Sequence, residues 1–266
     1  MSQSAPAETL GQIATAARSG RLDEAAVLAA RAFAVHGDDP VLAALAGAVE
    51  AHRGQFGRAA TYLAVAHRHR PDDLTVRTNL AEALFHLGRH DEARRLCDEA
   101  VATGDRTGRL ARMAGFYAQE DGDFAKAARL YRLVLKTQPD DWSLWNNLGN
   151  ALVGAGDAPG AVAALEKARA LAPESAPIRL NLGNALIEAG RFQEGEAALE
   201  EAARLFPDDA EPLIALANFH RRAGNEDALY AALARAAERA PGNAEIQSDY
   251  GQEAARRNDY AIAEPA

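Results

Sequence analysis

The sequence has little cysteine: Cys97 is the only one among 266 residues. No internal disulfide can form, and no cysteine cluster can bind zinc. Chains without structural disulfides are typical of reducing compartments, so we expect a cytoplasmic protein. Residues 1–13 show no basic segment followed by an apolar run, so we expect no secretory signal.

Long apolar runs and aromatic residues are also scarce. No stretch reaches the roughly 18 apolar residues of a membrane span, so we expect no membrane insertion. The chain is 48% hydrophobic but only 6% aromatic, and alanine dominates the apolar fraction. Many small and few large apolar residues predict closely packed helices rather than a deep aromatic core.

An excess of positive charge is missing as well. The formal net charge is −9, whereas nucleic-acid-binding proteins usually present a basic face. One stretch is locally basic, and we interpret it as a solvated surface among acidic neighbours rather than as a phosphate-binding strip. Its members are Arg89, Arg94, Arg95, Arg106, Arg109 and Arg112. We therefore expect no nucleic-acid partner.

Motifs for catalysis are missing too. The sequence contains no Walker A motif, no H-E-x-x-H and no G-x-S-x-G. Gly154, Gly156 and Gly160 resemble a phosphate-binding loop, but they follow a predicted helix rather than a strand. We therefore expect a turn between two helices at this place, no catalytic residue, no enzymatic activity and no cofactor.

Histidine and cysteine do not form a metal site or a nucleophile in this pattern. His86 and His90 are four residues apart, but Gly88 interrupts the helix that would place them on one face. We therefore expect no metal ligand. Cys97 stands in a column that is otherwise held mainly by leucine, so it is predicted to be a small core residue.

What the sequence does contain is an internal repeat of 34 residues. Steps of 34 from Gly156 meet glycine seven times and then asparagine. These positions are Gly20, Gly54, Gly88, Gly122, Gly156, Gly190, Gly224 and Asn258. The chain has only 21 glycines, so chance does not explain the column. Glycine and asparagine tolerate left-handed backbone, which predicts that each ends a helix in a tight turn.

Two further columns follow the same step. Small residues such as Gly149 and Gly183 precede the turn glycines by seven positions, where two helices are predicted to approach closely. Prolines such as Pro173 and Pro207 follow them by seventeen positions and are predicted to stop the second helix. Apolar residues between these columns have helical spacing. The sequence therefore predicts an all-α protein built of helix–turn–helix repeats.

The repeat resembles the tetratricopeptide repeat (TPR), whose pattern is W-x-x-L-G-x-x-Y, then A-x-x-x-F, then P. The best match here is Trp145-Leu148-Gly149-Leu152, then Ala161-Leu165, then Pro173. The resemblance implies an α-solenoid, a right-handed superhelix of seven repeats and a C-terminal capping helix. The expected boundaries are a tail at 1–5, a single solenoid at 6–258 and a tail or truncated helix at 259–266. The expected repeats are 6–39, 40–73, 74–107, 108–141, 142–175, 176–209, 210–243 and a partial repeat from 244.

The resemblance also implies a function. First helices of successive TPR repeats line a concave groove, so we expect an interaction scaffold that binds an extended segment of a protein or peptide partner. The inner face carries asparagines, which can both donate and accept hydrogen bonds, similar to the ladder in O-GlcNAc transferases. The candidates are Asn79, Asn146, Asn147, Asn150, Asn181, Asn184 and Asn218, with Arg109, Arg112, Arg221 and Arg222 beside them. Met113 and Ala215 interrupt this ladder.

The chemistry of the groove leaves two interpretations open. Aliphatic residues lie between the asparagines: Val153, Leu180, Ile187 and Ile214. With arginines at either side, this groove suits an extended peptide with acidic and apolar residues. Alternatively, the asparagines only pack and cap, the aliphatics fill gaps between helices, and Glu188 and Glu211 neutralise the arginines.

The last residues raise a second functional possibility. Residues 258–263 read like the start of a second helix, so we expect the front part of a longer protein; a frayed tail is the alternative. Bacterial sulfotransferases, glycosyltransferases and 2-oxoglutarate-dependent oxygenases carry such arrays, and residues 141–157 resemble those before sulfotransferase domains. The alternative function is therefore a recruiting domain of a larger enzyme. Self-assembly through the C-terminal end is a third hypothesis, although we favour a monomer.

Overall fold

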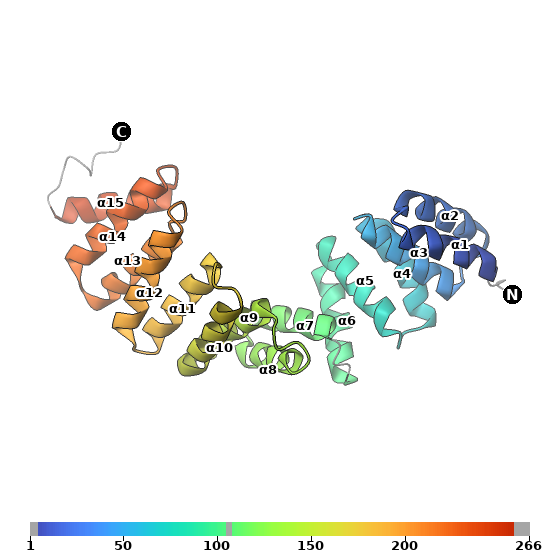
Figure 1. The fold of residues 1–266 in the computed structure, drawn as a ribbon, viewed down its shortest axis with the longest axis horizontal. Helices are drawn as coiled ribbons and strands as arrows, with labels where there is room; N and C mark the ends of the chain where they lie inside the picture. The colour runs from blue at the N-terminus through green and yellow to red at the C-terminus, as the bar shows by residue number, and fades with distance from the viewer. Residues whose placement is uncertain (1–4, 105–107, 258–266) are drawn as a thin grey trace. The chain divides into compact units, whose positions relative to one another are not determined.

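A computed structural model of the protein describes residues 5–104 and 108–257. These residues form fifteen α-helices and no strand, as the sequence predicts (Figure 1). The helices are α1 (Ala7–Arg18), α2 (Leu22–Val35), α3 (Pro40–His52), α4 (Phe56–His69), α5 (Leu74–His86), α6 (His90–Ala102), α7 (Gly108–Glu120), α8 (Phe124–Leu135), α9 (Trp142–Gly154), α10 (Ala158–Leu171), α11 (Ala176–Glu188), α12 (Phe192–Leu205), α13 (Glu211–Ala223), α14 (Glu226–Arg239) and α15 (Ala244–Arg256).

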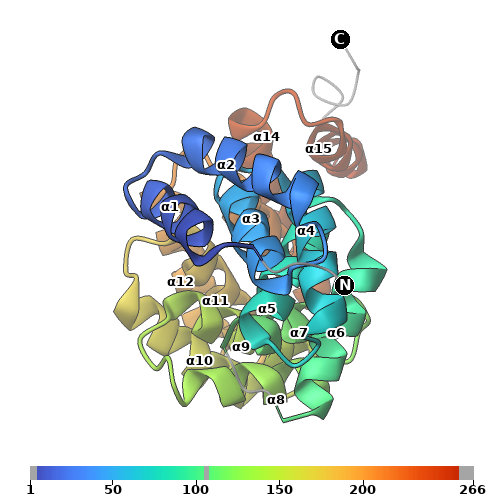
Figure 2. The same ribbon diagram turned by 90° about the vertical axis from the view of Figure 1, so that its right-hand side faces the viewer.

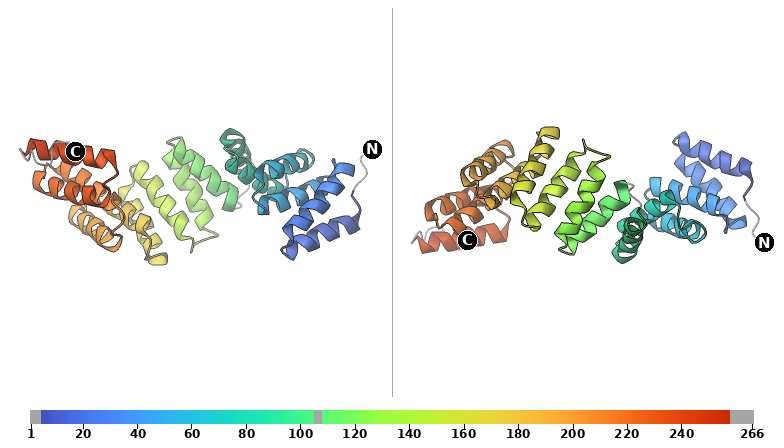
Figure 3. Two further views of the ribbon diagram at one scale, coloured as in Figure 1. Left: turned by 90° about the horizontal axis from the view of Figure 1, so that it is seen from above. Right: turned by 90° about the horizontal axis from the view of Figure 1, so that it is seen from below.

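Contacts divide the chain into two compact units, Met1–Tyr117 and Ala118–Ala266. In the first unit each of the helices α1–α5 contacts the next one in the chain, and α1, α3 and α5 also contact one another in series (Figure 2). In the second unit α8–α15 pack successively, and α9, α11 and α13 form the corresponding series (Figure 3). This two-layer arrangement is that of an α-solenoid. The repeat boundaries and the handedness of the superhelix stay predictions.

The turn glycines have the backbone that the repeat predicts. All seven glycines of the 34-residue column have φ between 69° and 78°, whereas Asn258 lies outside the described residues. At the end of α9 the amide of Gly156 donates to the Val153 carbonyl at 3.0 Å, and that of Asp157 donates to the Leu152 carbonyl at 2.8 Å. These two bonds form a Schellman motif, which satisfies the last carbonyls of the helix.

Small residues lie where the two helices of a repeat approach each other. A methyl group on Gly149 would lie 2.5 Å from Cγ of Leu165, and one on Gly183 would lie 2.6 Å from Cγ of Leu199. Both leucines are fully buried, and burial of such a side chain stabilises the fold by about 1.5–3 kcal/mol. The small column therefore allows a large residue of the second helix to fill the contact.

Helix starts are defined by side-chain caps. Asp39, Asp73, Asp141 and Asn243 precede α3, α5, α9 and α15, and each accepts from two backbone amides of the first turn. Such caps satisfy donors that have no partner within the helix. Within the described residues, no helix combines the length and apolar composition that crossing a membrane requires.

Candidate functional site

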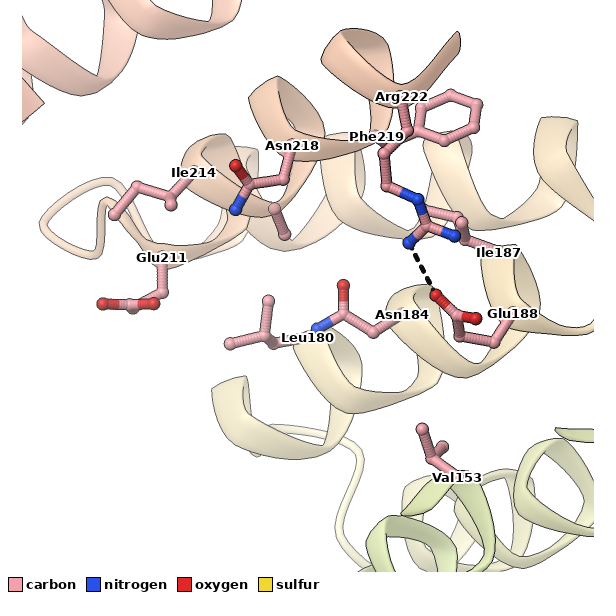
Figure 4. Close-up of a pocket in the computed structure, with 11 residues that line it drawn as sticks. Val153, Leu180, Asn184, Ile187, Glu188, Glu211, Ile214, Asn218, Phe219 and Arg222 are labelled. Atoms are coloured by element: carbon pink, nitrogen blue, oxygen red, sulfur yellow. Dashed lines mark hydrogen bonds and ion pairs between the residues drawn. The ribbon is translucent and has the colours of Figure 1, made fainter. Parts of the chain in front are cut away.

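First helices of three successive repeats in the second unit border a hollow of about 360 Å³ (Figure 4). The side chains recur at three- and four-residue intervals, so they share one face of each helix. The lining is Val153 from α9; Leu180, Asn184, Ile187 and Glu188 from α11; and Glu211, Ile214, Ala215, Asn218, Phe219 and Arg222 from α13. We name this the α11–α13 hollow.

The α11–α13 hollow combines an aliphatic lining with two amides. All four aliphatics that the sequence places between the asparagines line it. The side chains of Asn184 and Asn218 are exposed and are directed toward the space between α11 and α13 (Figure 4). The hollow can therefore bury an apolar group beside donors and acceptors of hydrogen bonds.

The arginines at this site are already paired. Arg222 donates to a carboxylate oxygen of Glu188 at 2.7 Å, and this hydrogen bond raises the pKa of Arg222. Arg221 donates to Asp249 at 2.7 Å and to the Asn218 amide oxygen at 3.1 Å. Glu188 thus neutralises an arginine, as one interpretation of the sequence holds. Glu211 has no ion pair with any described residue.

A neighbouring hollow of about 310 Å³ lies on the other side of α13. Its lining is Glu211, Ile214, Ala217, Asn218 and Arg221 from α13, Leu233 from α14, Asn243, and Glu245, Ile246 and Asp249 from α15. We name it the α13–α15 hollow. It shares Glu211, Ile214 and Asn218 with the first one, so the two form one continuous surface across α13.

The other four candidate asparagines of the second unit do not line either hollow. Asn146, Asn147, Asn150 and Asn181 are half-buried. Asn181 Nδ2 donates to Asn146 Oδ1 at 2.9 Å, so this pair joins α11 to α9. The predicted ladder thus contains two kinds of residue, because Asn184 and Asn218 border a hollow whereas Asn146 and Asn181 connect two helices.

The first unit brings Asn79 and Arg109 together at a different hollow of about 250 Å³. Arg109 forms an ion pair with Glu82. Arg112 is half-buried and does not line the hollow. The remaining lining, which the sequence analysis missed, is Ala48, Ala51, His52, Phe56, Ala83 and His86.

The missed histidines follow the repeat. His52 and His86 are separated by 34 residues, and further steps of 34 lead through Glu120 and Gly154 to Glu188 and Arg222. Members of this column border hollows in both units. The position of the two histidines in the repeat could therefore have identified them as lining residues. The ring of His86 stacks on that of Phe56, with centroids 4.1 Å apart.

The remaining groups with potential chemistry are metal-binding side chains and the buried Cys97 thiol. Residues 5–104 and 108–257 contain no group of three or more His, Cys, Asp or Glu side chains that could hold a metal ion. Burial raises the pKa of Cys97 to about 12, so the thiol stays protonated at neutral pH. Gly156 forms the predicted turn between α9 and α10.

The class that this fold defines is the α-solenoid of helix–turn–helix repeats. A family model of the tetratricopeptide repeat matches residues 50–115, 152–219 and 186–248, and a second one matches residues 112–176. The chain belongs to the tetratricopeptide repeat family. It is a scaffold for protein–protein interaction, as the sequence predicts.

Solved structures share this fold. The C-terminal part of a TPR repeat-containing protein from Cytophaga hutchinsonii has a TM-score of 0.68 at 13% identity, over 90% of this chain and 98% of that chain. A TPR protein from Parabacteroides merdae has 0.64 at 17%, over 82% and 86%. A MamA mutant has 0.57 at 20%, over 62% and 96%. A search of curated proteins finds no match.

Proposed function

We propose that the first helices of this scaffold bind an extended segment of a partner protein, and that the α11–α13 hollow is the centre of the site. One observation supports this proposal: four aliphatic side chains and the amides of Asn184 and Asn218 line the same hollow. Apolar contact area supplies affinity, and a few placed polar groups fix the orientation of the ligand.

An extended segment fits this arrangement better than a helix does. The two amides stand on successive first helices, so a chain that crosses both helices meets one amide on each. An extended chain offers unpaired main-chain N–H and C=O groups to these amides, whereas a helix has satisfied its own. Each such hydrogen bond stabilises a complex by about 0.5–1.5 kcal/mol.

Selection of peptides from a random display library on the full chain tests this function. We expect selected peptides to bind roughly tenfold more weakly to the Asn184→Ala/Asn218→Ala variant, because two hydrogen bonds are lost. The matched control is Asn147→Ala/Asn150→Ala, which removes two amides that line neither hollow. Circular dichroism checks that both variants are folded.

Two results would contradict the proposal. One is that no peptide is selected. The other is that selected peptides bind the Asn184→Ala/Asn218→Ala variant as tightly as they bind the wild-type chain. Stronger loss in the control variant would move the site to the α9 asparagines that the sequence singles out.

We propose further that the chain acts by binding alone, in the cytoplasm, on protein rather than nucleic acid. The net charge of −9 supports the choice of protein over nucleic acid. The single, buried cysteine supports a reducing compartment. A bacterial origin and a monomeric state also remain proposals.

A further inference from the structure

The charges around the two hollows of the second unit determine which partner they favour. We infer that the bound segment is basic and apolar, with an aliphatic residue in the α11–α13 hollow and a lysine or arginine at the α13–α15 hollow. This inference rests on the proposed function and adds the chemistry of the partner.

Both arginines of this surface are engaged by acidic side chains of the protein. Arg222 pairs with Glu188 and Arg221 pairs with Asp249, each at 2.7 Å. An acidic partner would have to compete with these carboxylates, and it would leave Glu188 or Asp249 without a counter-charge. Exchange of one exposed ion pair for another has little net effect.

Two carboxylates of the same surface have no such engagement. Glu211 borders both hollows and Glu245 borders the α13–α15 hollow. Both side chains belong to exposed residues, and neither forms an ion pair with a described residue. The two hollows together hold four carboxylates and two guanidinium groups, which leaves two negative charges for a partner to neutralise.

Three of the aliphatic side chains and the Glu245 carboxylate occupy different parts of the surface. Val153, Leu180 and Ile187 line only the α11–α13 hollow, whereas Glu245 lines only the α13–α15 hollow. Packed helices lie about 8–10 Å apart, and an extended chain advances about 3.3 Å per residue. The aliphatic and basic residues of the partner are therefore about three residues apart.

One interpretation of the sequence assigns the opposite charge to the partner, an acidic segment. That interpretation treats Arg221 and Arg222 as available to a ligand, but both are paired with carboxylates 28 and 34 residues away in the chain. The pairing changes the charge that a ligand meets. In the alternative interpretation of the sequence Glu211 neutralises an arginine, whereas in the structure Asp249 pairs with Arg221.

Fluorescence anisotropy with four short labelled peptides tests this inference. In the parent peptide, each leucine is followed by a lysine three residues later, and the other positions are serine. The other three carry glutamine for lysine, glutamate for lysine, or serine for leucine. We expect the lysine peptide to bind about tenfold more tightly than the glutamate peptide at low salt, and the difference to shrink at high salt. The peptide without leucine is expected to bind about tenfold more weakly than its parent.

Charge-neutral variants locate the effect. Glu211→Gln/Glu245→Gln should reduce the lysine-to-glutamate ratio to about twofold, because both partnerless carboxylates are gone. The matched control is Glu174→Gln/Glu238→Gln, which removes the same charge from exposed residues outside both hollows. It should keep the tenfold ratio and so exclude a general effect of the acidic chain.

Three outcomes overturn the inference. They are tighter or equal binding of the glutamate peptide, a ratio that Glu211→Gln/Glu245→Gln does not change, and no binding by any of the four peptides. The peptide selection described above distinguishes failure of this charge preference from failure of the proposed function. Selected peptides that need Asn184 and Asn218 but are acidic would preserve the binding site and refute its charge preference.

Discussion

At the scale of single residues, the column that contains Gly183 shows how closely the two helices of a repeat pack. A methyl group here would lie 2.6 Å from Cγ and Cδ2 of Leu199 and 3.4 Å from the Gly195 carbonyl. Leu199 is fully buried, and protein interiors are close-packed, so its side chain cannot move away without disturbing its neighbours. Helices α11 and α12 would have to separate.

We expect Gly183→Ala to destabilise the chain by about 1 kcal/mol. Overpacking costs about 1–3 kcal/mol, and the better helix propensity of alanine offsets up to about 1 kcal/mol of it. Chemical denaturation followed by circular dichroism measures the change in the free energy of unfolding.

Gly251 is the matched control, because it occupies the same column but has no described atom within 4 Å of an added methyl group. Gly251→Ala should stabilise the chain by about 0.5–1 kcal/mol. A Gly183→Ala variant as stable as the wild type would show that the contact is loose.

The residue-scale features differ in how far the sequence predicts them. The turn glycines and the small column follow from the 34-residue step, because backbone conformation and helix contact recur in each repeat. The charge of the site does not follow from it. Arg222 forms an ion pair with Glu188 one repeat earlier, whereas Arg221 forms one with Asp249 in α15. These partners depend on side-chain conformations, which do not repeat with the backbone.

At the scale of the element, the start of α3 is fixed by Asp39. One of its carboxylate oxygens accepts from the amides of Val41 and Leu42 at 2.8 and 2.9 Å, and the other accepts from the Ala5 amide at 2.8 Å. Burial by itself would raise the pKa of Asp39, but these hydrogen bonds and the charge of His36 outweigh it and lower the pKa. The cap therefore also attaches Ala5, which lies just before α1, to the start of α3.

We expect Asp39→Ala to destabilise the first unit by about 1–3 kcal/mol, because three amides lose their acceptor. Since the pKa is lowered on folding, the contribution of the charge is present above the unfolded value of about 4 and is lost as pH falls through the folded value. The stability difference between wild type and variant should therefore be constant above about pH 5 and shrink below about pH 4. Urea unfolding at several pH values measures it.

The corresponding cap Asp73 gives the comparison. It accepts from the amides of Thr75 and Val76 at 3.1 and 3.2 Å, and its other oxygen pairs with Arg70 at 3.0 Å. The ion pair is partly exposed and contributes little, so Asp73→Ala should cost about 1 kcal/mol. Equal costs at the two positions would refute the added role of the Ala5 contact. The sequence predicts both helix starts but not this contact, because nothing in the repeat pattern indicates that Ala5 is buried.

At the scale of the whole molecule, stability arises from contacts between neighbouring helices. Within the second unit, α11 contacts α9, α10, α12 and α13. In repeat proteins such nearest-neighbour terms add along the chain, so a local change need not destabilise every repeat equally. Regions can then open with different free energies.

We expect hydrogen exchange in Gly183→Ala to be faster by about fivefold in α11 and α12, which corresponds to a loss of about 1 kcal/mol. Smaller increases should occur in α10 and α13, and α1–α6 should exchange as in the wild type. Mass spectrometry of peptic fragments under native conditions resolves these segments. A uniform increase along the whole chain would indicate all-or-none unfolding instead.

Helix α13 borders both hollows of the second unit, and its Ile214 belongs to each of them. The proposed binding surface therefore lies at the seams between repeats, where first helices of neighbouring repeats meet, and not on a single repeat. Duplication or deletion of one 34-residue segment would preserve every turn and cap but create a new seam, with a new combination of side chains. Such a chain can acquire or lose a partner in a single recombination event, with no point mutation at all.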